Sequence, residues 1–222
     1  MYNHSMERNL YHGSESIVKK PELGIGNPNN DYGLGFYCCQ DKALGKQWGA
    51  RKTGEGFVNH YTIRDDNLKI LDLTKPPFDN VLYWVALLLH NHVLPERLKE
   101  NFPKELDYLN EHYLIDVNDY DAVIGYRADD SYFYFPLAFV RSEIRLEALE
   151  EIFKLGSLGK QYVLLSKRAF GLIRFVDFEV TTPKDRDNYY TRKEEADKSF
   201  KELLEKERYK KGTRMRDIVS YD

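Results

Sequence analysis

Residues 12–14, His12-Gly13-Ser14, form the first fragment whose residue types suit chemistry, and they end a short strand pattern over residues 9–12. An imidazole can hydrogen-bond a ligand hydroxyl, and a glycine has no Cβ to keep a ligand from the backbone. A strand-ending turn whose histidine bonds a neighbouring carbonyl has the same sequence. The fragment therefore predicts either a ligand contact or a structural turn.

The second fragment is GLGFY at residues 33–37, followed by a helical pattern that carries Trp48. Its glycines leave room beside the backbone for a flat ligand. Tyr37 and Trp48 could hold such a ligand between their rings, since aromatic stacking contributes about 0.5–1.5 kcal/mol beyond burial. The glycines precede a strand, whereas the dinucleotide-binding fingerprint follows one. A glycine-rich turn with a core tryptophan remains the structural alternative.

The third fragment is Gln161, which opens the apolar strand pattern of residues 161–166. A glutamine donates and accepts hydrogen bonds but carries no charge and no titratable proton. Asp129 and Asp130 follow another strand pattern, at residues 122–125, and could supply the missing acid. Adjacent aspartates at a strand end also suit a solvated turn or a helix cap, so this pair stays open.

The order and spacing of these fragments resemble the ADP-ribosyltransferase fold, in the branch typified by diphtheria toxin and the poly(ADP-ribose) polymerases. That branch has His-Gly-Ser or His-Gly-Thr on its first strand, then a Gly-x-Gly-aromatic-Tyr strand with an aromatic residue about eleven positions later. A Glu, Asp or Gln opens a later strand. The resemblance covers residues 9–180. The stretches DYGLGFY (31–37) and VIGYRADD (123–130) are, more narrowly, similar to an uncharacterised bacterial family of suspected toxin or toxin–antitoxin ADP-ribosyltransferases.

The resemblance implies that NAD is the co-substrate, that its nicotinamide–ribose bond is cleaved, and that ADP-ribose passes to an acceptor. His12 would bond the adenine-side ribose, the Gly13 backbone the nicotinamide amide, and Tyr37 and Trp48 would stack on the nicotinamide. No metal is implied. The NAD-binding set is then His12, Gly13, Ser14, Gly35, Phe36, Tyr37 and Trp48, and the catalytic set is His12, Tyr37, Gln161 and Asp130.

Gln161 is the departure that bears most on the reaction. General-base assistance contributes about 10²–10⁴-fold, and a glutamine cannot supply it. Either the acceptor is already nucleophilic, or another acid such as Asp130 fills the gap. Elongation of a polymer would need an activated hydroxyl, so a single transfer to a protein or nucleic acid is expected, in a toxin that has a cognate antitoxin in some settings.

Two alternatives stay open. Gln161 also fits a catalytically degenerate NAD-binding or protein-interaction module of the same fold. An RNA 2′-phosphotransferase shares the broader fold, but it needs several Arg and His residues around a phosphate, and the pair of Tyr37 and Trp48 fits nicotinamide better.

The elements that must position these residues mix strands and helices without regular βαβ alternation, which predicts an α+β fold. The resemblance further implies that the strands form a split mixed sheet with flanking helices. We expect a catalytic domain at residues 1–185 and, at 186–222, a charged amphipathic helical extension that docks on it through Phe200, Leu203 and Leu204. Strands are expected at 9–12, 36–39, 57–63, 68–73, 122–125, 161–166 and 172–180, and helices after Asp41, at 78–94, 103–118, 131–155 and around 168–170.

Composition narrows the classes of function. The 222 residues carry 33 basic and 36 acidic side chains, a net charge of −3, which gives no bulk affinity for nucleic acid or anionic membrane. The absence of a long apolar run or a signal-like N-terminus predicts a cytoplasmic protein without a membrane segment. The adjacent Cys38 and Cys39 cannot join distant segments. His90 and His92 lie two apart on a predicted helix, so they face different directions and make a poor metal site.

Overall fold

The computed structural model describes residues 7–128, 132–154 and 159–220, and it has the α+β fold that the sequence predicts. Its strands form one mixed sheet in the order β4-β5-β6-β2-β1-β3-β7, in which β4 and β5 are parallel and the other neighbours antiparallel. The strands are β1 (Glu7–Ser14), β2 (Phe36–Cys39), β3 (Phe57–Arg64), β4 (Ile70–Asp72), β5 (Ala122–Tyr126), β6 (Lys160–Leu164) and β7 (Arg174–Val180).

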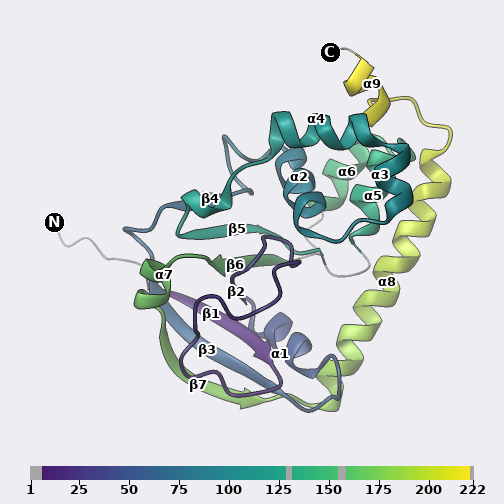
Figure 1. The fold of residues 1–222 in the computed structure, drawn as a ribbon. Helices are drawn as coiled ribbons and strands as arrows, with labels where there is room; N and C mark the ends of the chain where they lie inside the picture. The colour runs from purple at the N-terminus through teal and green to yellow at the C-terminus, as the bar shows by residue number, and fades with distance from the viewer. Residues whose placement is uncertain (1–6, 129–131, 155–158, 221–222) are drawn as a thin grey trace.

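The helices gather mainly on one side of the sheet, above β5 and β6 in Figure 1, while α1 lies near β1. They are α1 (Lys42–Ala50), α2 (Val81–Asn91), α3 (Glu96–Asn101), α4 (Pro103–Tyr113), the 3-10 helix η1 (Val117–Asp119), α5 (Tyr134–Val140), α6 (Leu146–Lys154), α7 (Lys167–Leu172), α8 (Pro183–Glu207) and α9 (Met215–Ser220). Asp41 caps α1 by accepting from the backbone N–H groups of Ala43 and Leu44, as predicted.

Several predicted boundaries were wrong. The helix predicted over 131–155 is two helices, because the chain turns at Ser142, whose φ is 58°. The helix predicted over 103–118 ends at Tyr113. The strand predicted from 68 begins at Ile70, and the first strand starts at Glu7 and continues through Ser14.

The main core lies between the sheet and the helices above it. Helix α2 is buried over most of its surface, with Trp84, Val85 and Leu88 at 1% exposure or less. This explains the unbroken apolar run in its sequence, because a helix that is apolar all round must be covered on all sides. Among the described residues, no helix is both long and apolar enough to cross a membrane.

Helix α8 runs along one side of the molecule, from the neighbourhood of α1 to the helices α3 and α5 (Figure 1). Phe200, Leu203 and Leu204 pack on the main core, so the predicted docking stripe is confirmed. The helix is continuous across residues 185 and 186, where the sequence places a domain boundary.

The C-terminal end of α8 is fixed by a buried ion pair. The Glu207 side chain is fully buried and accepts from Arg145 Nε at 2.7 Å and Nη2 at 2.9 Å, with Lys210 at 3.1 Å. Arg214 donates to the carbonyl of Glu207 and to those of Ser142 and Glu143. The hydrogen bonds from Arg145 lower the pKa of Glu207 to about 2.

We predict that Glu207→Gln lowers the free energy of unfolding by roughly 2–4 kcal/mol at pH 7, because it leaves Arg145 without its buried counter-charge. A carboxyl group whose pKa is depressed by folding stabilises the protein above its unfolded pKa and loses that effect as pH falls toward its folded value. The difference from wild type should therefore shrink between pH 4.5 and about 2. Urea denaturation over this pH range measures it, with the exposed Glu205→Gln as control. A constant difference across the range would contradict the prediction.

Candidate active site

A cavity of about 1000 Å³ gathers most of the predicted site residues. His12, Gly13, Gly35, Phe36, Tyr37, Trp48 and Gln161 all line it. Ser14 does not line it: its hydroxyl donates to the carbonyl of Ser16 and accepts from Asn59 Nδ2, so it fixes the loop after β1. Asp130 lies outside the described residues.

The sheet register brings the distant fragments together. Tyr11 of β1 is opposite Cys39 of β2, Cys39 is opposite Gln161 of β6, and Gln161 is opposite Gly125 of β5. The row crosses four strands that are separated by up to 150 positions in the sequence. Strand β2 therefore places the His12 fragment and Gln161 on either side of itself.

His12 is held in one orientation by the backbone of the second fragment. Its Nδ1 lies 2.7 Å from the carbonyl oxygen of Tyr37, and its ring packs on Phe36 with the centroids 4.4 Å apart. Burial lowers the pKa of His12 more than the hydrogen bond to the Tyr37 carbonyl raises it. A neutral ring with Nδ1–H on the carbonyl leaves Nε2 as an acceptor for a ligand hydroxyl.

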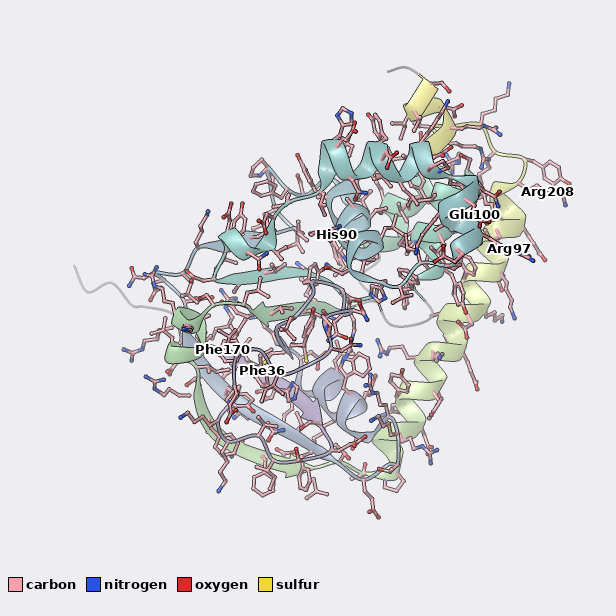
Figure 2. The ribbon with its side chains drawn as sticks, in the orientation of Figure 1. Phe36, His90, Arg97, Glu100, Phe170 and Arg208 are labelled. Carbon is pink, nitrogen blue, oxygen red and sulfur yellow. The ribbon has the colours of Figure 1, made fainter. Side chains whose placement is uncertain are left out.

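Phe36 extends this packing away from the cavity. Its ring lies 5.5 Å from that of Tyr61 and 6.2 Å from that of Phe170, and Figure 2 shows Phe36 and Phe170 close together. His12 is therefore supported on one face by an aromatic cluster, which belongs to a second, smaller hydrophobic core that includes Tyr61, Phe36 and Phe170.

Tyr37 uses its hydroxyl to hold the preceding loop. The hydroxyl donates to the carbonyl of Gly33 at 2.6 Å and accepts from the N–H of Tyr32 at 3.0 Å. Burial raises the pKa of Tyr37 well above its ordinary value, so the phenol stays protonated. Gly33 has φ +74°, a conformation that favours glycine, and this explains its place in the turn.

Trp48 has a different environment from the open stacking surface that the sequence predicts. The guanidinium carbons of Arg51 and Arg127 lie 4.0 and 3.8 Å from the centre of its ring, within the range of cation–π attraction. The ring of Tyr189, from α8, lies 6.0 Å away. Trp48 therefore holds two cations at the cavity wall, where they suit an anionic ligand.

Further cationic side chains line the same cavity, and they outnumber the acidic ones. The cationic lining consists of Lys20, Arg51, Lys52, Arg127, Lys160 and Lys193, and the acidic lining of Glu22 and Asp31. This imbalance occurs in a chain whose net charge is −3, so it is a local property of the cavity.

The glycine of the His-Gly-Ser fragment serves helix packing. A Cβ on Gly13 would lie 2.2 Å from the carbonyl oxygen of Gly45 and 2.5 Å from the nitrogen of Gly49, so the backbone of α1 fills that space. Gly45 is itself confined, with Val58 and Tyr11 about 3.0 Å or less from its own Cβ position. This close approach brings Leu44 and Trp48 of α1, and Arg51 directly after it, to the cavity.

Asp31 is the acidic residue that lies beside Gln161, and it is not among the site residues that the sequence predicts. Its side chain is buried, and Oδ2 accepts from Gln161 Nε2 at 3.2 Å and from the Ala128 N–H at 2.9 Å. Oδ1 accepts from His92 Nε2 at 2.9 Å. His92, which the sequence predicts to make a poor metal site with His90, also lines the cavity.

A sequence signal for Asp31 existed, because it opens the DYGLGFY stretch that the resemblance singled out. No comparable signal existed for His92. It follows the last residue of α2, and only the folded chain brings it within hydrogen-bond distance of a residue 61 positions earlier.

The cysteines of β2 line the cavity without being reactive groups. Burial raises the pKa of Cys39 to about 11 and also raises that of Cys38, so both thiols stay protonated near neutral pH. Within the described part of the chain, no group of three or more His, Cys, Asp or Glu side chains is arranged to hold a metal ion.

In a comparison with known families, residues 8–175 match the family described as Protein of unknown function (DUF3990). The chain belongs to the DUF3990 family. No match is found to curated proteins or to solved structures. The DUF3990 match covers β1, β2, β6 and the cavity residues on them, whereas α8, which adds Tyr189, Tyr190 and Lys193 to the cavity, begins after it.

We predict that Gln161→Glu lowers the free energy of unfolding by roughly 2–4 kcal/mol at pH 7, because it buries a second carboxyl group against Asp31. Gln161→Met removes only the hydrogen bond and should cost about 1–2 kcal/mol. Urea denaturation compares the two variants. In an Asp31→Asn background the extra cost of the glutamate substitution should disappear, and a cost that persists there would contradict the pairing.

Proposed function

We propose that this protein is an NAD-dependent mono-ADP-ribosyltransferase, which cleaves the nicotinamide–ribose bond of NAD and transfers ADP-ribose to a macromolecular acceptor. The observation that carries the proposal is that His12, Tyr37 and Gln161, from three distant fragments, line one cavity with Trp48. The proposal includes an ADP-ribosyltransferase-like arrangement of the mixed sheet.

The first fragment offers the hydrogen bonds that the ribose and carboxamide of NAD would use. His12 Nε2 is available to accept from a ribose hydroxyl, because Nδ1 is taken by the Tyr37 carbonyl. Strand β1 pairs with β3 along its length, but among the described residues its register with β2 is limited to Tyr11 and Cys39. The backbone edge of Gly13 that faces β2 is thus outside the ladder, where it could pair with the nicotinamide amide.

The second fragment would hold the leaving group. The Tyr37 hydroxyl is used within the loop, so its ring is fixed in place and can support a flat nicotinamide. The Trp48 ring is occupied by the guanidinium groups of Arg51 and Arg127, which would bind the diphosphate of NAD. This ring is therefore less suited to stacking on the nicotinamide. We therefore assign the stacking to Tyr37 and the anionic part of NAD to this cationic wall.

The reaction passes through a ribose that carries positive charge, as in glycoside cleavage, so the site must hold the ring and stabilise that charge. Gln161 is 7% exposed and lines the cavity. Its Oε1 is buried and has no hydrogen-bond partner among the described residues, so it is the acceptor that we assign to a ribose hydroxyl. The acceptor would be a protein or a nucleic acid. The resemblance to toxin-like ADP-ribosyltransferases further implies a bacterial toxin or toxin–antitoxin component that acts in the cytoplasm.

The test measures nicotinamide release and transfer of labelled ADP-ribose from NAD into a bacterial lysate. His12→Ala and Tyr37→Ala should each lower nicotinamide release by about 100-fold or more, because the substrate loses its alignment. His90→Ala and Tyr209→Ala, both at exposed positions, serve as matched controls and should keep the wild-type rate.

Tyr37→Phe separates the stacking of the ring from the hydrogen bonds of the hydroxyl, since it keeps the ring and removes the group that holds the loop. If the protein at high concentration binds NAD but releases no nicotinamide, it is an NAD-binding module and not an enzyme. If NAD does not bind at all, the proposal fails.

A further inference from the structure

Asp31 and His92 form a buried acid–imidazole pair on the cavity wall that the three motifs do not include. Asp31 is 5% exposed, and its Oδ1 accepts from His92 Nε2 at 2.9 Å. Because a carboxylate only accepts, the shared hydrogen must be on Nε2. The ring of His92 is therefore fixed as the tautomer whose Nδ1 carries a lone pair.

The position of the His92 ring is fixed by packing as well. It stacks on Phe133, with the centroids 4.4 Å apart and the planes 24° from parallel. The side chain is 23% exposed and lines the cavity, and within the described chain Nδ1 has no hydrogen-bond partner. An imidazole that is oriented by a carboxylate and keeps one nitrogen accessible is the arrangement of a general base.

Asp31 also orients Gln161. Its Oδ2 accepts from Gln161 Nε2, so the amide oxygen Oε1 must face away from the carboxyl group. His92 and Gln161 thus bond to the two oxygens of a single carboxyl group, which places an acceptor for the ribose and a base for the incoming nucleophile side by side.

We infer that His92 is the general base for the acceptor and that Asp31 is its positioning residue, an assignment that rests on the proposed transferase function. The acceptor class that needs this base is a neutral nucleophile that carries a proton, such as a hydroxyl group. The sequence leaves two possibilities for the missing base: an acceptor that is already nucleophilic, or another acid–base group in the site. Asp31 and His92 favour the second.

The proposed transfer breaks one bond and forms another at ribose C1′. The bond between ribose C1′ and the nicotinamide nitrogen breaks, and its electron pair leaves with neutral nicotinamide. The hydroxyl oxygen forms the new bond to C1′, and its proton passes to Nδ1 of His92. The resulting imidazolium is stabilised by Asp31 and later releases the proton to water.

The experiment compares two small nucleophiles with the full-length protein and NAD at neutral pH. Methanol must lose a proton when it attacks, whereas azide is an anion and needs no base. Chromatography measures the methyl and azido products of ADP-ribose, and their ratio is independent of how much protein is folded. His92→Gln should lower the ratio of methyl to azido product by about 10²-fold or more, and Asp31→Asn should lower it in the same direction.

The matched control is His90→Gln, at a position on α2 just before His92 but outside the cavity, and it should keep the wild-type ratio. Figure 2 shows His90 on α2, well apart from Phe36 at the cavity. An unchanged ratio in His92→Gln overturns the inference while nicotinamide release by the wild type still supports the transferase. No nicotinamide release from the wild type, with or without either nucleophile, overturns both.

Discussion

Asp31 joins separate parts of the chain through one buried carboxyl group, and the geometry of the cavity depends on it. The group accepts from His92 after α2, from the Ala128 backbone after β5, and from Gln161 on β6. Leaving a buried carboxyl group without such partners would be costly, so each partner is constrained in turn. The Asn91 amide, which donates to the Asp31 carbonyl, adds a further link to α2.

This anchoring determines how the glycine-rich loop enters β2. Tyr32 follows Asp31, is fully buried, and donates its hydroxyl to the carbonyl of Tyr126 across Gly125, where a Cβ would clash. The loop is therefore fixed in the core before it reaches Gly33, and the Tyr37 hydroxyl then closes it. His12 takes its orientation from the Tyr37 carbonyl, so the second fragment positions the first.

The opposite wall of the cavity depends on close backbone packing. Gly13 and Gly49 allow α1 to lie against β1 and β3 at distances that a side chain would prevent, and this places Trp48 over the cavity. Helix α8 completes the wall with Tyr189 near α1, while its far end is held by the buried Glu207. The cavity is thus made by early, middle and late segments of the described chain, and its cationic lining combines side chains from all three.

The sequence by itself determined the α+β class, most strands, the cap at Asp41 and the docking stripe of α8, because these follow from local periodicity and capping. Short motifs also named the seven predicted site residues that line the cavity. Boundaries such as those of α5 and α6 were less accessible, since a turn at Ser142 has no strong local signal. The role of Gly13 in helix packing, the arginines on Trp48 and the link from Asp31 to His92 and Gln161 were decided only by the tertiary structure. Each of these is a contact between segments far apart in the chain. The residue pattern within one segment does not predict which distant residue will neutralise its charge or pack against it.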